Sequence, residues 1–205
     1  ILITAGSLQG LDLVNDVMLS PGDTVIVEQM TYGGAITRLN RAGVNIVGVP
    51  VDDDGLSSNA LAATLADLKA RGIQPKYIYT IPTVQNPTAT VMSAERRQAI
   101  LALSREHGVP IFEDECYADL VWSGERPQAL YGMATDDRVF HIGSFSKTIA
   151  PALRLDRAEP EQARRNARAP EQAEVLGGHH RLGRGGMGVT KLLLEQRQQA
   201  IAQRG

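Results

Sequence analysis

The chain has 205 residues, of which 43% are hydrophobic and 4% aromatic, and its formal net charge is −2. This composition is typical of a soluble α/β protein, and so small a net charge favours neither nucleic acid nor a membrane surface as a partner. Cys116 is the only cysteine, which excludes an internal disulfide and fits a reducing, cytoplasmic compartment. No apolar run approaches the roughly 20 residues of a membrane span.

The first half of the chain alternates short apolar runs with segments of helical periodicity. Residues 1–4 are expected to form a strand, followed by a helix at 8–19 with Ser7 as its N-cap. A Gly-Ser turn before a helix presents free backbone N–H groups at the positive end of the helix dipole, so Gly6-Ser7 is either an anion site or an ordinary helix start. The next expected strands are 24–28, 45–50 and 76–80, with helices between Gly34 and Ala42 and after Ser57 or Ser58.

Two of these strands lead into residues that suit a binding site. Tyr32 follows a buried strand, at the edge where open α/β sheets bind ligands. Its ring could stack on a flat ligand or simply pack at a helix start. After the strand at 76–80, two prolines bracket a loop that contains Gln85 and Asn86. Because Asn86 precedes a proline, it is held extended and can form a cis bond, so this loop aims an amide at a fixed point.

The second half continues with a helix at 94–107, capped by Ser93, and a strand at 109–115 that ends in three acidic residues. Asp114 and Tyr117 are close together in sequence at this strand end. A carboxylate there could hold a protonated ring nitrogen, and the phenol could reach an oxyanion. The alternative is an acidic strand end that faces water.

A strand at 139–142 precedes a lysine that stands among small hydroxyl residues. Lys147 follows Ser144 and Ser146, and Arg154 comes seven positions later. Burial or a nearby cation, here Arg154, lowers the pKa of a lysine from about 10.4 and makes it a nucleophile. Hydroxyls and a guanidinium around one lysine also suit a phosphorylated aldehyde. The alternative is an ordinary solvated lysine.

Residues 1–155 alternate strands with helices, which predicts an α/β fold with a doubly wound, mostly parallel sheet and flanking helices. We assign them to a partial cofactor-binding large domain. Residues 156–205 differ in composition, since Val175 is the only β-branched residue as far as residue 186, and they are expected to form an atypical, linker-like tail. His179-His180 has no further ligand at metal spacing, so no metal site is expected.

Together these motifs resemble the fold-type I pyridoxal-phosphate enzymes. The match covers residues 1 to about 155 and includes several separate motifs in the order of the family. The chain is most similar to the class I/II aminotransferases, in the branch that holds 2-aminoadipate aminotransferases and the effector domains of MocR-type regulators. The resemblance implies the large domain of this fold and pyridoxal 5'-phosphate as the cofactor. It also implies a homodimer with the active site at the dimer interface.

The resemblance further implies a role for each candidate residue. Lys147 is similar to the lysine that forms a Schiff base with the cofactor, and Asp114 to the carboxylate that keeps the ring nitrogen protonated. Tyr32 is similar to the aromatic residue stacked on the pyridine ring, while Asn86 and Tyr117 are similar to the partners of the 3-oxygen of the ring. The phosphate group is expected to bind at Gly6, Ser7, Leu8, Gln9, Ser144, Ser146 and Arg154.

The function that this resemblance implies is transamination between an amino acid and a 2-oxo acid. Asp114 would stabilise the protonated ring, and Lys147 would act as the general base. Two alternatives stay open: the ligand-sensing domain of a MocR-type transcription regulator, and an inactive aminotransferase fragment. After Leu155 the small domain of the family is not recognisable, and the N-terminal arm is also absent. We therefore expect a chain that is truncated at both ends or read in a shifted frame near residue 155.

Overall fold

The computed structural model describes residues 1–121, 123–147, 149 and 156–159. Its centre is a seven-stranded sheet in the order β1-β9-β8-β7-β6-β2-β3. From β3 to β8 the neighbouring strands run parallel, whereas β9 is antiparallel to both of its neighbours. The strands are β1 (Leu2–Thr4), β2 (Thr24–Glu28), β3 (Asn45–Val49), β6 (Ile78–Thr80), β7 (Ile111–Asp114), β8 (Val139–Ser144) and β9 (Asp156–Glu159).

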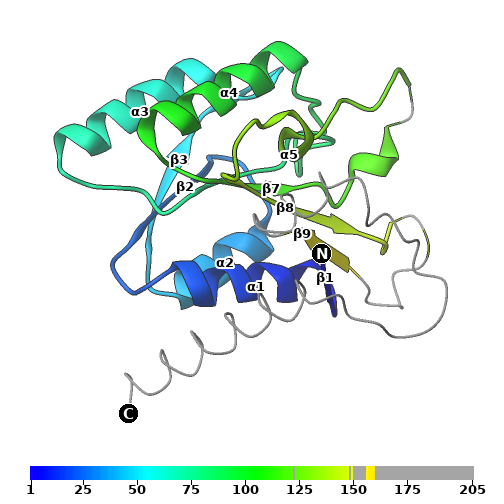
Figure 1. Ribbon diagram of the computed structural model, residues 1–205, viewed down its shortest axis with the longest axis horizontal. Helices are drawn as coiled ribbons and strands as arrows, with labels where there is room; N and C mark the ends of the chain where they lie inside the picture. The colour runs from blue at the N-terminus through cyan, green and yellow to red at the C-terminus, as the bar shows by residue number, and fades with distance from the viewer. Residues whose placement is uncertain (122, 148, 150–155, 160–205) are drawn as a thin grey trace.

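Helices cover both faces of this sheet, with α3 and α4 on one face and α1 and α2 on the other (Figure 1). This arrangement confirms the predicted α/β class with a doubly wound, mostly parallel sheet. The helices are α1 (Ser7–Met18), α2 (Gly33–Arg41), α3 (Ser58–Ala70), α4 (Ala94–His107) and α5 (Leu130–Met133), with a 3-10 turn η1 at Ala118–Leu120 and a small hairpin of β4 (Val51–Asp52) and β5 (Gly55–Leu56).

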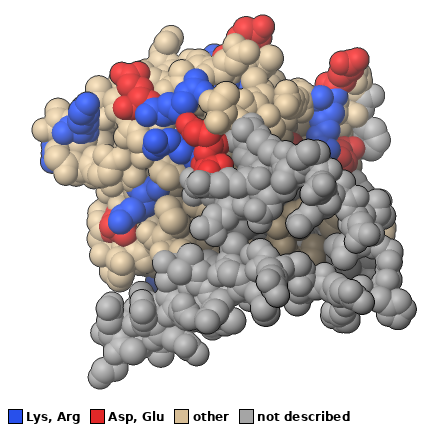
Figure 2. All heavy atoms as spheres, viewed as in Figure 1, with Lys and Arg blue, Asp and Glu red and all other residues tan. Residues whose placement is uncertain are grey.

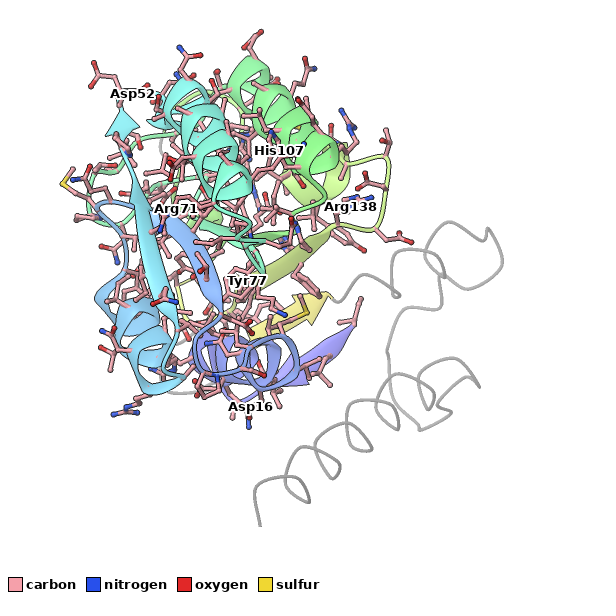
Figure 3. The ribbon with its side chains drawn as sticks, turned by 90° about the vertical axis from the view of Figure 1, so that its left-hand side faces the viewer. Asp16, Asp52, Arg71, Tyr77, His107 and Arg138 are labelled. Carbon is pink, nitrogen blue, oxygen red and sulfur yellow. The ribbon has the colours of Figure 1, made fainter. Side chains whose placement is uncertain are left out.

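The core consists of two apolar clusters, one on each side of the sheet. Ile26 of β2 belongs to the cluster under α3 and α4, while Val25 and Val27 belong to the cluster under α1 and α2. Because β2 is buried on both faces, its sequence is a nearly continuous apolar run without alternation. Figure 3 shows Tyr77 between the sheet and the layer of α1 and α2, where its hydroxyl donates to Oδ1 of Asn15 at 2.6 Å.

Local capping signals predict the starts of α3 and α4 correctly. Ser57 and Ser93 are N-caps whose hydroxyl oxygens accept hydrogen bonds from Ala60 N and Arg96 N. The predicted N-cap role of Ser7 is wrong, because Gly6 is the N-cap of α1 and Ser7 is the first helical residue. Gly6 has a φ of 96°, which a glycine adopts far more easily than a serine.

The strand β9 lies within the segment that was expected to form a linker-like tail. Its residues 156–159 pair with both β1 and β8, so they are part of the central sheet. Arg154 and the remainder of the tail from residue 160 lie outside the described residues. The division of the chain near residue 155 therefore stays a prediction.

The surface carries acidic and basic side chains side by side. On the face shown in Figure 2, several of the described lysine and arginine side chains lie next to aspartate and glutamate side chains. Asp52, on the small hairpin, forms such an ion pair with Arg96 at 3.1 Å. Among the helices that the structure describes, no stretch combines the length and apolarity that a membrane crossing requires.

Candidate cofactor pocket

An open pocket of about 120 Å³ lies at the carboxyl ends of the parallel strands β7 and β8. It is bordered by the start of α1, the start of α2 and the segment that follows β8. Nine of the predicted site residues line this pocket, whereas Gln9 and Asn86 do not, and Arg154 lies outside the described residues. Among the described residues, its lining consists of Gly6, Ser7, Leu8, Tyr32, Ile81, Asp114, Cys116, Tyr117, Ser144, Ser146 and Lys147.

The start of α1 contributes backbone donors to this pocket. The Gly6 carbonyl accepts hydrogen bonds from Gln9 N at 3.0 Å and Gly10 N at 3.3 Å, which closes the first helical turn. The first N–H groups of a helix have no partner within it, and the helix dipole is positive there, so Ser7 and Leu8 present donors suited to an anion. Gln9 is exposed, and its Oε1 accepts Ala5 N at 2.6 Å, so its side chain is used within the turn and not at the pocket.

Asp114 ends β7 and is fixed by two donors. The Tyr79 hydroxyl donates to its Oδ2 at 2.7 Å, and Cys116 N donates to its Oδ1 at 3.1 Å. Burial and the nearby Asp114 raise the pKa of Tyr79 well above its usual value, so its hydroxyl keeps its proton and stays a donor. The alternative of an acidic strand end facing water is wrong, since the exposed fractions of Glu113, Asp114 and Glu115 are 0%, 9% and 4%.

Tyr117 interacts with two other predicted site residues, Asn86 and Lys147. Its hydroxyl forms a hydrogen bond with the Asn86 side chain, so Asn86 borders the pocket through Tyr117 although it does not line it. Burial raises the pKa of Tyr117, and Cys116 and Asp114 raise it further, while the bond to Asn86 lowers it. Lys147 is exposed, with its Nζ 5.4 Å from the centroid of the Tyr117 ring. The Asn86-Pro87 bond is cis, as the sequence allowed.

The other two sides of the pocket carry the hydroxyl groups of Ser144 and Ser146 and the ring of Tyr32. Ser144 ends β8, and its Oγ accepts Ser146 N at 3.1 Å, which folds the segment before Lys147 back towards the strand. Tyr32 is the N-cap residue of α2. A Cβ atom at Gly34 would lie 2.5 Å from two atoms of the Tyr32 ring, so the glycine leaves room for the ring at this position.

Sequence reasoning missed the residues that hold this site from behind. Tyr79 fixes Asp114, and the buried Glu28 accepts Thr80 Oγ1 at 2.6 Å and Gln85 Nε2 at 2.9 Å. An acidic residue at the end of a buried strand signals a required partner. The identity of that partner, however, depends on which strands are neighbours, and the sequence does not state the strand order.

Comparison with known protein families gives a match to the model of aminotransferase class I and II over residues 1–154. The chain is 35% identical to aromatic-amino-acid aminotransferase 1 of Thermococcus litoralis over 177 residues, which covers 85% of this chain and 42% of that protein. It is 36% identical over 155 residues to the uncharacterized HTH-type transcriptional regulator YisV of Bacillus subtilis, covering 76% of this chain and 31% of that one. The chain thus spans less than half the length of these relatives.

A solved structure shares the same architecture. The kynurenine aminotransferase of Pyrococcus horikoshii, crystallised in complex with PMP, superposes with a TM-score of 0.77 at 35% sequence identity. That superposition covers 81% of this chain and 41% of the other. Because the family model matches well over half of the sequence, this chain belongs to the class I and II aminotransferase family.

Proposed function

We propose that this chain is the cofactor-binding part of a pyridoxal-phosphate-dependent aminotransferase, which moves an amino group between an amino acid and a 2-oxo acid. The observation that carries the proposal is the convergence of Lys147, Asp114 and Tyr117 with the start of α1 on one pocket. The relative from P. horikoshii, whose structure contains the aminated form of this cofactor, supports the choice of cofactor.

The described residues fit pyridoxal phosphate at both of its ends. The start of α1 offers backbone N–H donors to a phosphate, and the hydroxyls of Ser144 and Ser146 lie in the same pocket. At the other end, the Asp114 carboxylate is held by two donors and lines the pocket, where it can pair with a protonated ring nitrogen. Arg154 is proposed to complete the phosphate site on the resemblance of its motif alone.

When bound, pyridoxal phosphate supplies an electron sink for the charge that develops at the substrate α-carbon. Asp114 then holds a proton on the ring nitrogen by charge pairing at its carboxylate oxygens. Tyr117 and Asn86 would hold the ring through hydrogen bonds to its oxygen, and Tyr32 would supply an aromatic surface for it. Lys147 Nζ would hold the cofactor between turnovers, and as a free amine it would take the proton from the substrate α-carbon and deliver it to the cofactor side of the substrate nitrogen.

Substrates, assembly and location are parts of the same proposal. The substrates are an amino acid and a 2-oxo acid, and the functional form is a cytoplasmic homodimer that binds neither nucleic acid nor membrane. Apolar side chains border the pocket segments and support a partner subunit there: Met30 is 51% exposed, Phe145 37% and Ile149 68%. Each of these three residues is close in sequence to Tyr32 or Lys147.

A second candidate function is ligand sensing in a transcription regulator. The match to the B. subtilis regulator favours it, because a regulator of this family can use the same pocket for recognition. The two functions differ in turnover. A sensor binds the cofactor and an amino acid without releasing a 2-oxo acid, whereas a transaminase releases one for every amino group it accepts.

The test is an absorbance experiment on the purified protein with pyridoxal phosphate. We expect a visible band that appears in the wild type, is absent in Lys147→Ala, and bleaches when amino acids are added, with release of a stoichiometric 2-oxo acid. An amino acid that changes the band without release of a 2-oxo acid would favour the sensing function. A folded protein without a band would contradict both.

A further inference from the structure

Glu28 is a buried carboxylate that the proposed mechanism does not use. It is the last residue of β2 and is 0% exposed, and it does not line the pocket. The two chain segments around it do reach the pocket. Met30 and Thr31 lead from Glu28 to Tyr32, and the loop that follows β6 leads to Asn86. Glu28 therefore lies behind the site, between two of its walls.

Its two oxygens accept hydrogen bonds from three segments. Oε1 accepts Thr80 Oγ1 at 2.6 Å and Ile81 N at 3.1 Å, which ties it to the end of β6. Oε2 accepts Gln85 Nε2 at 2.9 Å from the loop and Thr31 Oγ1 at 3.4 Å from its own segment. Four donors aimed at one carboxylate define the position of that group closely.

Gln85 extends this connection on the loop side. Its Nε2 also donates to the Met30 carbonyl at 2.6 Å, and its Oε1 accepts both N and Oγ1 of Thr88 at 2.8 Å. Every polar atom of the Gln85 side chain is thus engaged. The residue that follows it is Asn86, which bonds to Tyr117.

The energetic cost of Glu28 argues that it does more than fill space. A buried carboxylate is destabilising unless it is well paired, and the contacts recorded for Glu28 in the described chain are two hydroxyls, an amide and a backbone N–H, all without charge. Burial accordingly raises its pKa to about 7. An apolar residue would give a strand end of the same shape without this cost, but it could not accept four donors.

We propose that Glu28 and Gln85 form a positioning pair, which fixes the place where Asn86 meets Tyr117 and the path that leads to Tyr32. The carboxylate of Glu28 is the common anchor, and the amide of Gln85 transmits its position to the loop. The effect of this pair on the cofactor rests on the proposed function, because Glu28 and Gln85 act on the cofactor only through the residues they hold. Its geometric part concerns the loop itself and can be measured without cofactor.

The test compares Glu28→Gln with the wild type in two measurements. The first is amide hydrogen exchange of residues 85–90 in the cofactor-free protein, where we expect at least a tenfold faster exchange. The second is pyridoxal phosphate affinity, measured by equilibrium dialysis, where we expect about tenfold weaker binding with attachment at Lys147 retained. Glutamine has the same shape as glutamate, but its side-chain NH2 is a donor and would face the groups that donate to Glu28 in the wild type.

Two controls separate positioning from general loss of stability. Leu65→Ala removes a buried side chain of α3 and lowers stability, but we expect it to leave loop exchange and cofactor affinity unchanged. Gln85→Met keeps Glu28 but removes the side-chain hydrogen bonds of Gln85 to Glu28, to the Met30 carbonyl and to Thr88, so it should speed loop exchange and weaken cofactor binding as Glu28→Gln does. It also keeps the inference testable if Glu28→Gln fails to fold.

The outcomes distinguish this inference from the proposed function. Unchanged loop exchange in both Glu28→Gln and Gln85→Met would overturn the positioning role, as would an equal effect of Leu65→Ala on exchange and affinity. If the wild type binds no pyridoxal phosphate, the proposed function fails. The exchange measurement on the cofactor-free protein still decides whether Glu28 holds the loop.

Discussion

Asp114 and Tyr79 form a pair in which the position of one side chain depends on the other. The Tyr79 hydroxyl lies 2.7 Å from Asp114 Oδ2, and its ring packs edge-on against Phe112. Tyr77 offers a matched comparison on the same segment. Its ring packs edge-on against the same Phe112, while its hydroxyl bonds to Asn15, outside the pocket lining. The two tyrosine rings therefore pack in the same way, but their hydroxyls bond to different residues, and only the partner of Tyr79 lines the pocket.

We predict that Tyr79→Phe weakens pyridoxal phosphate binding by about fivefold to tenfold, because Asp114 loses one of the two donors that orient it. Tyr77→Phe also loses one buried hydrogen bond, so it should lower the free energy of unfolding by about 1 kcal/mol, but it should leave the affinity for pyridoxal phosphate unchanged. Equilibrium dialysis and urea denaturation of both variants check this. Equal affinities of the two variants would show that the Tyr79 hydroxyl has no bearing on the pocket.

The raised pKa of Glu28 predicts a pH dependence of stability. The pKa is about 7 in the folded protein and 4.5 in the unfolded reference, so the folded state keeps a proton in the interval between them. The contribution of Glu28 to the free energy of unfolding is therefore fully present below pH 4.5. It is lost as the pH rises through 7, by about 3 kcal/mol in total. Urea denaturation from pH 4.5 to 8 should show this loss in the wild type relative to Glu28→Gln. Parallel curves for the two proteins would contradict it.

At the level of single residues, the sequence predicts a functional role where the neighbouring residues in the chain indicate it. Lys147 stands among hydroxyl residues and Asp114 ends an apolar run, so their placement in one pocket could be expected. Glu28 and Tyr79 could not be found in this way. Each acts through a partner on another segment, more than 30 positions away, and only the strand order places those partners together.

Among the elements, the loop between β6 and α4 has a second anchor in addition to Glu28. Arg97 of α4 is 0% exposed, and its guanidinium donates to the carbonyls of Pro82 and Met92 at 2.9 and 3.0 Å and to Thr83 Oγ1 at 2.8 Å. It also lies within 4 Å of the buried Glu113 and Glu115 carboxylates. One planar group thus holds both ends of the loop and compensates two acids.

We predict that Arg97→Lys lowers the free energy of unfolding by at least about 2 kcal/mol, because an ammonium cannot reproduce the planar set of donors. Arg71→Lys is the control. Arg71 pairs with Asp67 at the surface with a side chain 60% exposed, so its replacement should cost under about 0.5 kcal/mol. Urea denaturation measures both, and similar costs would mean that the buried donors of Arg97 are not needed.

Element boundaries were predictable where the signal is local. The Ser93 cap and the glycine at the end of α4, with a φ of 66°, are both visible in the sequence, and α4 begins and ends where they indicate. The start of α1 was misplaced by one residue because a serine and a glycine both favour helix starts, and only the backbone angle separates them. The pairing of β9 with β1 and β8 depends on the whole sheet, so composition alone did not reveal it.

For the whole molecule, the pocket is open and exposed apolar residues lie in the chain segments beside it. Its walls come from strand ends and helix starts of one chain, and Met30, Phe145 and Ile149 are exposed in the segments beside it. Burial of such side chains favours association.

We predict a homodimer, with a mass twice the 22.1 kDa of the chain, in sedimentation equilibrium at micromolar concentration. Ile149→Glu should shift the equilibrium to monomer, because a charge would be buried at the contact. Val17→Glu, at a residue of α1 that is 39% exposed and does not line the pocket, should leave the dimer intact. A wild-type protein that sediments as a monomer would contradict the expected assembly.

The central claim is that Lys147 attaches pyridoxal phosphate within the pocket that Asp114 lines. The most direct measurement is borohydride reduction of the protein with the cofactor, followed by peptide mass mapping. We predict one modified peptide, with the phosphopyridoxyl mass on Lys147, strongly reduced in Asp114→Asn and absent in Lys147→Ala. Modification spread over surface lysines such as Lys69 and Lys76, or unchanged in Lys147→Ala, would contradict the account.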